Sequence, residues 1–136
     1  AQDILTYSAR IQQVNVPFVI DHTGRVQAAM GLDQAPFKSL LELMKNPLAW
    51  VKVCGGERVS VGKRPFADAA PFARALIEAA PDRVLWGTDW PHPNFSKDMP
   101  NDGELVDLML DFCDTPELRQ KLMVDNPQRL YGFDPL

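Results

Sequence analysis

The most informative part of this 136-residue sequence is the stretch Val84-Leu-Trp-Gly-Thr-Asp-Trp-Pro-His-Pro93. Its apolar beginning predicts a short strand, buried on both faces, over residues 84–87. Pro91 and Pro93 cannot extend a strand ladder, so we expect the chain to turn outward here. Asp89 would then lie at the C-terminal end of a buried strand, where α/β proteins bind their ligands. The alternative is that Asp89 only caps the turn that follows.

The composition is that of an ordinary globular protein, with 46% hydrophobic residues, 24% charged residues and a formal net charge of −4. No basic stripe indicates a nucleic-acid partner. No apolar run approaches the about 20 residues that a membrane-spanning helix needs. Two cysteines are too few for a disulfide framework, so we expect a cytoplasmic protein. The chain opens at Ala1 in what reads as the middle of an element, so we expect an N-terminal portion before it.

Predicted strands and helices alternate along the chain. Helices are expected over residues 3–13, 36–45, 68–80, 102–113 and 115–124, and strands over residues 17–21, 50–54 and 84–87. Asp68 and Asp102 are the predicted N-caps of their helices, and a polar loop is expected after Arg58, up to Arg64-Pro65. The strands recur at about thirty residues, which is the size of a βαβ unit, so a parallel sheet is expected.

Polar groups follow each predicted strand, at Asp21-His22, at Gly55-Gly56-Glu57-Arg58 and at Thr88-Asp89. The carboxyl ends of parallel strands share one edge, so these groups should meet there. His22 can act as a metal ligand or as a general acid or base, although a histidine after a strand is more often structural. Arg58 follows two glycines, and its guanidinium suits a carboxylate ligand; the alternative is a surface arginine in a mobile loop.

Two further residues are expected near this edge. His92 is flanked by prolines and is a candidate substrate-binding residue, with a structural role as the alternative. Cys54 has no obvious base partner in the sequence, so we interpret it as a small, buried apolar residue.

Four segments resemble the metal-dependent hydrolases of the amidohydrolase superfamily, and most of all its 2-pyrone-4,6-dicarboxylate hydrolase group of lactonases. They are Phe18-Val-Ile-Asp-His-Thr-Gly-Arg25, Lys52-Val-Cys-Gly-Gly-Glu-Arg58, Val84-Leu-Trp-Gly-Thr-Asp-Trp-Pro-His-Pro93 and Asn126-Pro-Gln-Arg-Leu-Tyr-Gly-Phe133. The resemblance covers nearly the whole chain. The third segment is its specific part, whereas the last is common across the superfamily.

The resemblance implies an α/β fold in which this chain forms about strands 6–8 of a (β/α)8 TIM-type barrel. A whole barrel needs roughly 250 residues. Residues 1–136 would therefore be the C-terminal part of one amidohydrolase domain whose N-terminal half, with the His-x-His pair of the first strand, is absent. Such a part has open strand edges, and we expect it to be inactive alone and to aggregate or pair.

The resemblance also implies a mechanism. Asp89 would be the general base that activates water for attack on a lactone carbonyl, His22 would polarise that carbonyl, and Arg58 would bind a ring carboxylate. The substrate would be a small dicarboxylate lactone from the breakdown of aromatic, lignin-type compounds. The 2-pyrone-4,6-dicarboxylate hydrolases need no metal, so the resemblance implies no cofactor.

Two alternatives stay open. One is a zinc-dependent decarboxylase, or a sugar or muconolactone lactonase, of the same superfamily, with His22 and Asp89 as metal ligands. The other is a non-catalytic α/β module that binds carboxylates through Arg58 and His22 and folds alone as a stable monomer. The sequence leaves the oligomeric state open.

Overall fold

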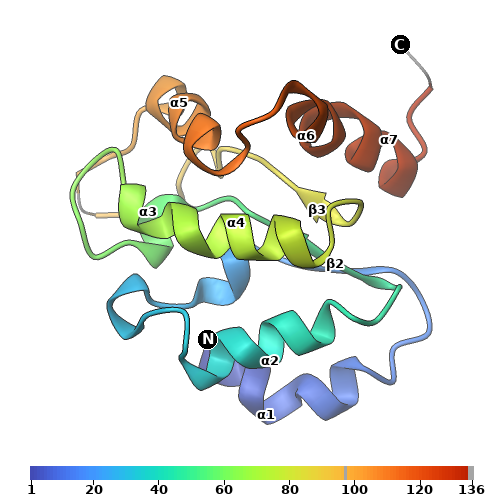
Figure 1. Cartoon of the computed structure of the whole chain (residues 1–136). Coiled ribbons are helices and arrows are strands. Elements are labelled where there is room, and N and C mark those ends of the chain that lie inside the picture. The colour runs from blue at the N-terminus through green and yellow to red at the C-terminus, as the bar shows by residue number, and fades with distance from the viewer. Residues whose placement is uncertain (97, 135–136) are drawn as a thin grey trace.

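The computed structural model describes residues 1–96 and 98–134 and has an α/β architecture (Figure 1). Its three strands are β1 (Phe18–Ile20), β2 (Ala49–Lys52) and β3 (Val84–Leu85). They form a parallel sheet in the order β1-β2-β3, as the spacing predicted.

The third strand is shorter than predicted. The last bond of its ladder runs from the amide of Val53 to the carbonyl of Leu85, at 2.8 Å. After Cys54 the backbone of Gly55 adopts a left-handed conformation (φ 67°) and turns β2 into a helix. The ladder ends there because β3 has lost its partner, so Trp86 and Gly87 lie beyond the strand.

Helices and single turns fill the connections. The longer helices are α1 (Gln2–Ile11), α2 (Ala35–Leu43), α4 (Ala70–Ala79) and α5 (Asp102–Phe112). The short ones are α3 (Gly56–Val59), α6 (Pro116–Gln120) and α7 (Asn126–Tyr131), with turns η1 (His22–Arg25), η2 (Ala28–Met30), η3 (Ala67–Ala69) and η4 (Lys121–Asp125). None of the helices in the described residues is long and apolar enough to cross a membrane.

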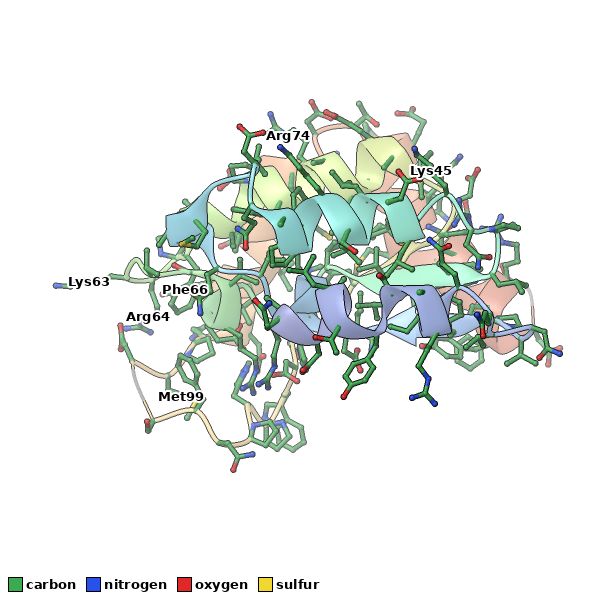
Figure 2. The ribbon with its side chains drawn as sticks, turned by 90° about the horizontal axis from the view of Figure 1, so that it is seen from below. Lys45, Lys63, Arg64, Phe66, Arg74 and Met99 are labelled. Carbon is green, nitrogen blue, oxygen red and sulfur yellow. The ribbon has the colours of Figure 1, made fainter. Side chains whose placement is uncertain are left out.

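The two ends of the sheet carry different segments. Figure 2 shows Lys45, which follows α2, at one end of the molecule, and Arg64 and Met99, from the segments that follow α3 and β3, at the other. An ion pair joins the latter two segments, since Arg64 Nε lies 3.0 Å from Asp98 Oδ2. The carboxyl ends of the strands therefore lie at the end of the molecule where the segments that carry Arg64 and Met99 come together.

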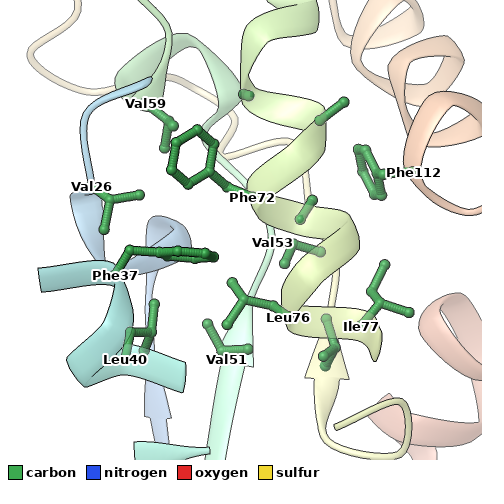
Figure 3. Packing of buried hydrophobic residues seen from close by; sticks show 14 of the residues in the cluster. Val26, Phe37, Leu40, Val51, Val53, Val59, Phe72, Leu76, Ile77 and Phe112 are labelled. Carbon is green, nitrogen blue, oxygen red and sulfur yellow. The ribbon is translucent and has the colours of Figure 1, made fainter. Parts of the chain in front are cut away.

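The core lies between β2 and the helices α2 and α4 (Figure 3). Phe37 of α2 and Phe72 of α4 meet edge to face, with ring centroids 5.0 Å apart. Leu40, Val51 and Leu76 are fully buried around them. Burial of each such side chain contributes about 1.5–3 kcal/mol, so this layer fixes both helices on one face of the sheet.

Two predicted N-caps are wrong. Asn101, not Asp102, caps α5, because its side-chain oxygen accepts hydrogen bonds from the amides of Gly103 (2.8 Å) and Glu104 (3.3 Å). Asp102 already has a place in the first helical turn. Asp68 lies within η3, and its carboxylate accepts hydrogen bonds from the Ser60 hydroxyl and the Val61 amide. A cap must have extended backbone just before the helix, and the sequence does not specify which residue does.

The C-terminal segment is tied to the opposite end of the sheet. Asn126 is 1% exposed, and its side-chain amide donates to the carbonyls of Pro81 (2.9 Å) and Val84 (2.8 Å), at the start of β3. The Arg129 guanidinium also lies 5.1 Å from the centroid of the Trp50 ring, at the start of β2. These contacts hold α7 at the end of the sheet where the strands begin, away from the segments that carry Arg64 and Met99.

Replacing Asn126 should therefore destabilise the fold. Asn126→Ala leaves the buried carbonyl oxygen of Val84 and the partly buried one of Pro81 without their donor, and we expect the free energy of unfolding to fall by about 2 kcal/mol. Urea unfolding measures the change. Met123→Ala, at an exposed position of the neighbouring turn, is the control and should change stability by less than about 0.5 kcal/mol. An equal loss in both variants would contradict the assigned role.

Candidate active site

The polar groups that follow the three strands converge on one carboxylate. Arg58 of α3 donates from Nε to Asp89 Oδ2 at 2.6 Å and from Nη2 to the carbonyl of Pro93 at 2.9 Å. The other oxygen of Asp89, Oδ1, lies 3.7 Å from Nε2 of His22. The three side chains are 10%, 14% and 20% exposed for Arg58, Asp89 and His22. They are shielded from bulk water and still accessible from one side.

The backbone at this edge is unusual. His22 (φ 52°) and Asp89 (φ 68°) both adopt the left-handed conformation that residues with a Cβ rarely take. Strained backbone of this kind is concentrated at functional sites, where the surroundings hold it in place. Gly55 (φ 67°) permits the close approach of His22, because a Cβ on Gly55 would lie 2.9 Å from His22 Nδ1. The double glycine thus makes room for the imidazole ring.

Cys54 contacts the same imidazole. Its burial agrees with the sequence interpretation, and that burial raises the pKa of the thiol to about 11. The thiol is therefore protonated at neutral pH, and its sulfur lies 3.4 Å from His22 Nδ1. If the thiol donates to Nδ1 of a neutral imidazole, the ring proton is on Nε2, the atom that faces Asp89. Sequence reasoning gave Cys54 no base partner and missed this contact, because the strand pattern does not specify toward which neighbour the Cys54 side chain points.

Glu57 is the residue that sequence reasoning missed most clearly. The helices predicted from the sequence do not include residues 56–59, which form α3, and the Glu57 side chain is 0% exposed. Its Oε1 lies 3.5 Å from Arg58 Nε and 3.6 Å from His92 Nδ1. The glycine pair was the sequence signal that could have indicated its burial. Gly55 turns the chain into α3, and Glu57, the second residue of that helix, points inward.

His92 lies behind the site rather than at its opening. Its side chain is 4% exposed, and its Nε2 lies 3.3 Å from Asp102 Oδ1. The prediction that His92 binds substrate gains no support from this burial, because the ring is enclosed by protein groups on both nitrogens. Its role as a structural residue, the alternative in the sequence, agrees better with its surroundings.

This chain supplies only part of the ligand set that a catalytic zinc needs. A catalytic zinc needs three protein ligands, and the resemblance assigned only His22 and Asp89. A hydrogen bond from Arg58 already holds the second oxygen of Asp89. Glu57, Asp89 and His92 also offer ligand atoms within 4.8 Å of one another. The guanidinium of Arg58 contacts both carboxylates of this group, so its positive charge already lies beside them.

Comparison with known proteins identifies relatives. The sequence model of a family described as amidohydrolase matches residues 3–133. The 4-sulfomuconolactone hydrolase of Hydrogenophaga intermedia is 47% identical over 131 residues, which are 95% of this chain and 43% of the relative. The 2-pyrone-4,6-dicarboxylate hydrolase of Comamonas testosteroni is 47% identical over 122 residues, 83% of this chain and 40% of the relative.

A solved structure shares the fold. The apo crystal structure of a protein from Agrobacterium tumefaciens superposes with a TM-score of 0.85 at 30% identity, covering 99% of this chain and 48% of that one. The present chain spans less than half the length of each of these relatives. Its three strands and their helices thus match about half of that solved structure.

The close contact at Gly55 can be tested against a matched glycine. Gly55→Ala places a methyl group against the His22 ring in addition to straining the backbone, whereas Gly132 has nearly the same left-handed backbone (φ 69°, ψ 34°, against φ 67°, ψ 40° at Gly55) and no atom within 4 Å of an added Cβ. Both variants should lose about 1–2 kcal/mol from the left-handed backbone. Only Gly55→Ala should lose more in urea unfolding, by about 1 kcal/mol or more of steric overlap. Equal losses would contradict the close approach.

The burial of Cys54 can be tested by alkylation. The thiolate is the reactive species, and a pKa of about 11 instead of 9.0 means about 100-fold less thiolate at pH 8. Iodoacetamide should therefore modify native Cys54 about 100-fold more slowly than the same residue in urea. Peptide mass spectrometry measures both rates. A native rate equal to that in urea would show that the thiol is not buried beside His22.

Proposed function

Since the chain belongs to the amidohydrolase family, we propose that the protein containing it opens the ring of a small dicarboxylate lactone of the 2-pyrone-4,6-dicarboxylate type. The observation that carries this proposal is the contact of Asp89 with Arg58 on one oxygen and its approach to His22 on the other. The names of the two relatives reported above, a 4-sulfomuconolactone hydrolase and a 2-pyrone-4,6-dicarboxylate hydrolase, support a lactone as the substrate class. The reaction would belong to the breakdown of aromatic compounds.

We propose that residues 1–136 are the C-terminal part of one (β/α)8 domain, with β1, β2 and β3 as its sixth, seventh and eighth strands. The parallel order of the strands and the helical connections between them support this placement. So does the coverage of about half of the solved relative. The remaining strands would pair with the outer edges of β1 and β3, and would supply the His-x-His pair that the resemblance implies.

The reaction would begin at Asp89. Its ionised carboxylate, held by Arg58, takes a proton from a water molecule, and the water oxygen bonds to the lactone carbonyl carbon. The N–H of His22 donates to the oxyanion that develops on the carbonyl oxygen. When the tetrahedral intermediate collapses, the ring C–O bond breaks, and Asp89 returns its proton to the leaving ring oxygen.

Arg58 would serve both the base and the substrate. Two of its five N–H groups bind Asp89 and the carbonyl of Pro93, which leaves three that can bind a ring carboxylate. A carboxylate bound there would place the substrate within reach of Asp89, because one guanidinium contacts both. We propose that no metal is required, since the positive charge beside Asp89 is that of Arg58.

Asp89→Asn is the direct test in the full-length protein. The amide keeps the size of the side chain and cannot accept the proton, so we expect kcat to fall by about 10²–10⁴-fold while the substrate still binds. The loss of pyrone absorbance of 2-pyrone-4,6-dicarboxylate measures turnover, and calorimetry measures binding. Asp107→Asn, on the exposed face of α5, is the control and should turn over normally. A near-normal kcat for Asp89→Asn would exclude Asp89 as the base.

Metal analysis of the same protein separates the proposal from its zinc-dependent alternative. We expect activity to survive dialysis against a strong chelator. Stoichiometric zinc, with activity that is lost on chelation and restored by the metal, would favour the alternative.

A further inference from the structure

We propose that Glu57 and His92 are positioning residues, which hold Arg58 against Asp89 without contacting the substrate. This inference rests on the function proposed above and adds two residues to its site. It follows from four features, namely the burial of Glu57, the surroundings of His92, the backbone of the loop after β3, and the position of the Arg58 guanidinium.

Glu57 is a buried carboxylate with no hydrogen bond to any described residue. Both of its oxygens are inaccessible and unpartnered, and its side chain is 0% exposed. A buried carboxylate is strongly unfavourable unless positive groups compensate it. The groups that face Oε1 are Arg58 Nε at 3.5 Å and His92 Nδ1 at 3.6 Å. The charge of Glu57 therefore binds it to these two neighbours.

His92 connects three segments of the chain. Its Nδ1 faces Glu57 on α3, its Nε2 lies 3.3 Å from Asp102 at the start of α5, and its own backbone belongs to the loop after β3. The ring is almost completely buried between the two carboxylates. It therefore fixes the distance between the loop that carries Asp89 and the helix that carries Arg58.

The loop after β3 needs such support. Asp89, His92 and Asn94 all have left-handed backbones, with φ of 68°, 54° and 60°. The turn is closed by bonds from the His92 amide to the Asp89 carbonyl (2.7 Å) and from the Phe95 amide to the His92 carbonyl (3.2 Å). Strained backbone persists only where the surroundings over-determine it. His92 is the buried side chain of this turn, so its contacts set the direction of Asp89.

Glu57 and Asp89 contact the same guanidinium. Arg58 Nε is 3.5 Å from Glu57 Oε1 and 2.6 Å from Asp89 Oδ2. The negative charge of Glu57 keeps the guanidinium in the buried position from which it holds Asp89. Without that charge Arg58 can swing toward solvent, and Asp89 loses the hydrogen bond that directs its other oxygen toward His22. Misplacement of a reacting group by about 1 Å can cost about 10²-fold in rate.

The test uses Glu57→Gln and His92→Gln in the full-length protein. Both substitutions keep a polar side chain of similar size and remove the ionic contact. We expect kcat for 2-pyrone-4,6-dicarboxylate to fall about 10-fold or more, with KM changed less than about 3-fold, because alignment of the base is affected more than binding. Glu57→Asp, which keeps the charge, should recover part of the loss. Unchanged kcat in both Gln variants would overturn the proposal.

Glu104→Gln is the matched control. One oxygen of Glu104 is also buried without a hydrogen bond, but its side chain is 45% exposed and its ion pair, at 3.8 Å, is with Arg64. This variant should keep its kcat. A loss equal to that of Glu57→Gln would show a general effect of removing a carboxylate charge and would overturn the specific role.

A double-mutant cycle with Arg58→Lys tests whether Glu57 acts through Arg58. Glu57→Gln should lower kcat less than about 2-fold further in the Arg58→Lys background, since the guanidinium that it positions is gone. The full loss of the single variant, added to that of Arg58→Lys, would overturn the assignment. A residue that only stabilises the fold would give this additive result.

Hydrogen exchange gives a readout that does not need activity. Residues 88–95 should exchange faster in Glu57→Gln and His92→Gln, and at the native rate in Glu104→Gln. If the native protein opens no lactone, the proposed function fails, while faster exchange in both variants still supports the pair. If exchange and kcat are both native in the two variants, the pair fails, while the proposed function stands.

Discussion

The contact between Arg58 and Asp89 is the interaction on which this end of the molecule depends. It joins the segment after β2 to the segment after β3 through one short hydrogen bond, and a second bond to the carbonyl of Pro93 fixes the guanidinium. Parallel strands make the contact possible, because their carboxyl ends lie at one edge of the sheet. Residues 31 positions apart in the sequence thus become neighbours.

The charges at this edge are arranged around that guanidinium. Glu57 lies on its buried side and Asp89 at the accessible side, so one cation compensates two carboxylates. Because Arg58 occupies Oδ2 of Asp89, the remaining oxygen is directed toward His22, whose opposite nitrogen contacts the protonated thiol of Cys54. Each polar group of the site is therefore oriented by a neighbour from a different strand end.

The chain shows the characteristic motifs of its family over nearly its full length and spans less than half of its curated relatives. The hydrophobic core of the described residues gathers around β2, α2 and α4 and is built from this chain's own side chains. The site is different, because a lactone needs groups on more than one side. Its opposite wall, in our proposal, comes from the strands that complete the barrel.

The sequence by itself determined the order of strands and helices, the parallel sheet and the meeting of His22, Arg58 and Asp89, because apolar periodicity and βαβ spacing are local properties. Only the tertiary structure decided the burial of Glu57, the enclosure of His92 and the choice of Asn101 as a cap. These depend on left-handed backbone at Gly55 and Asp89 and on contacts between distant segments. A local pattern does not specify either of them, since both arise from the packing of one loop against another.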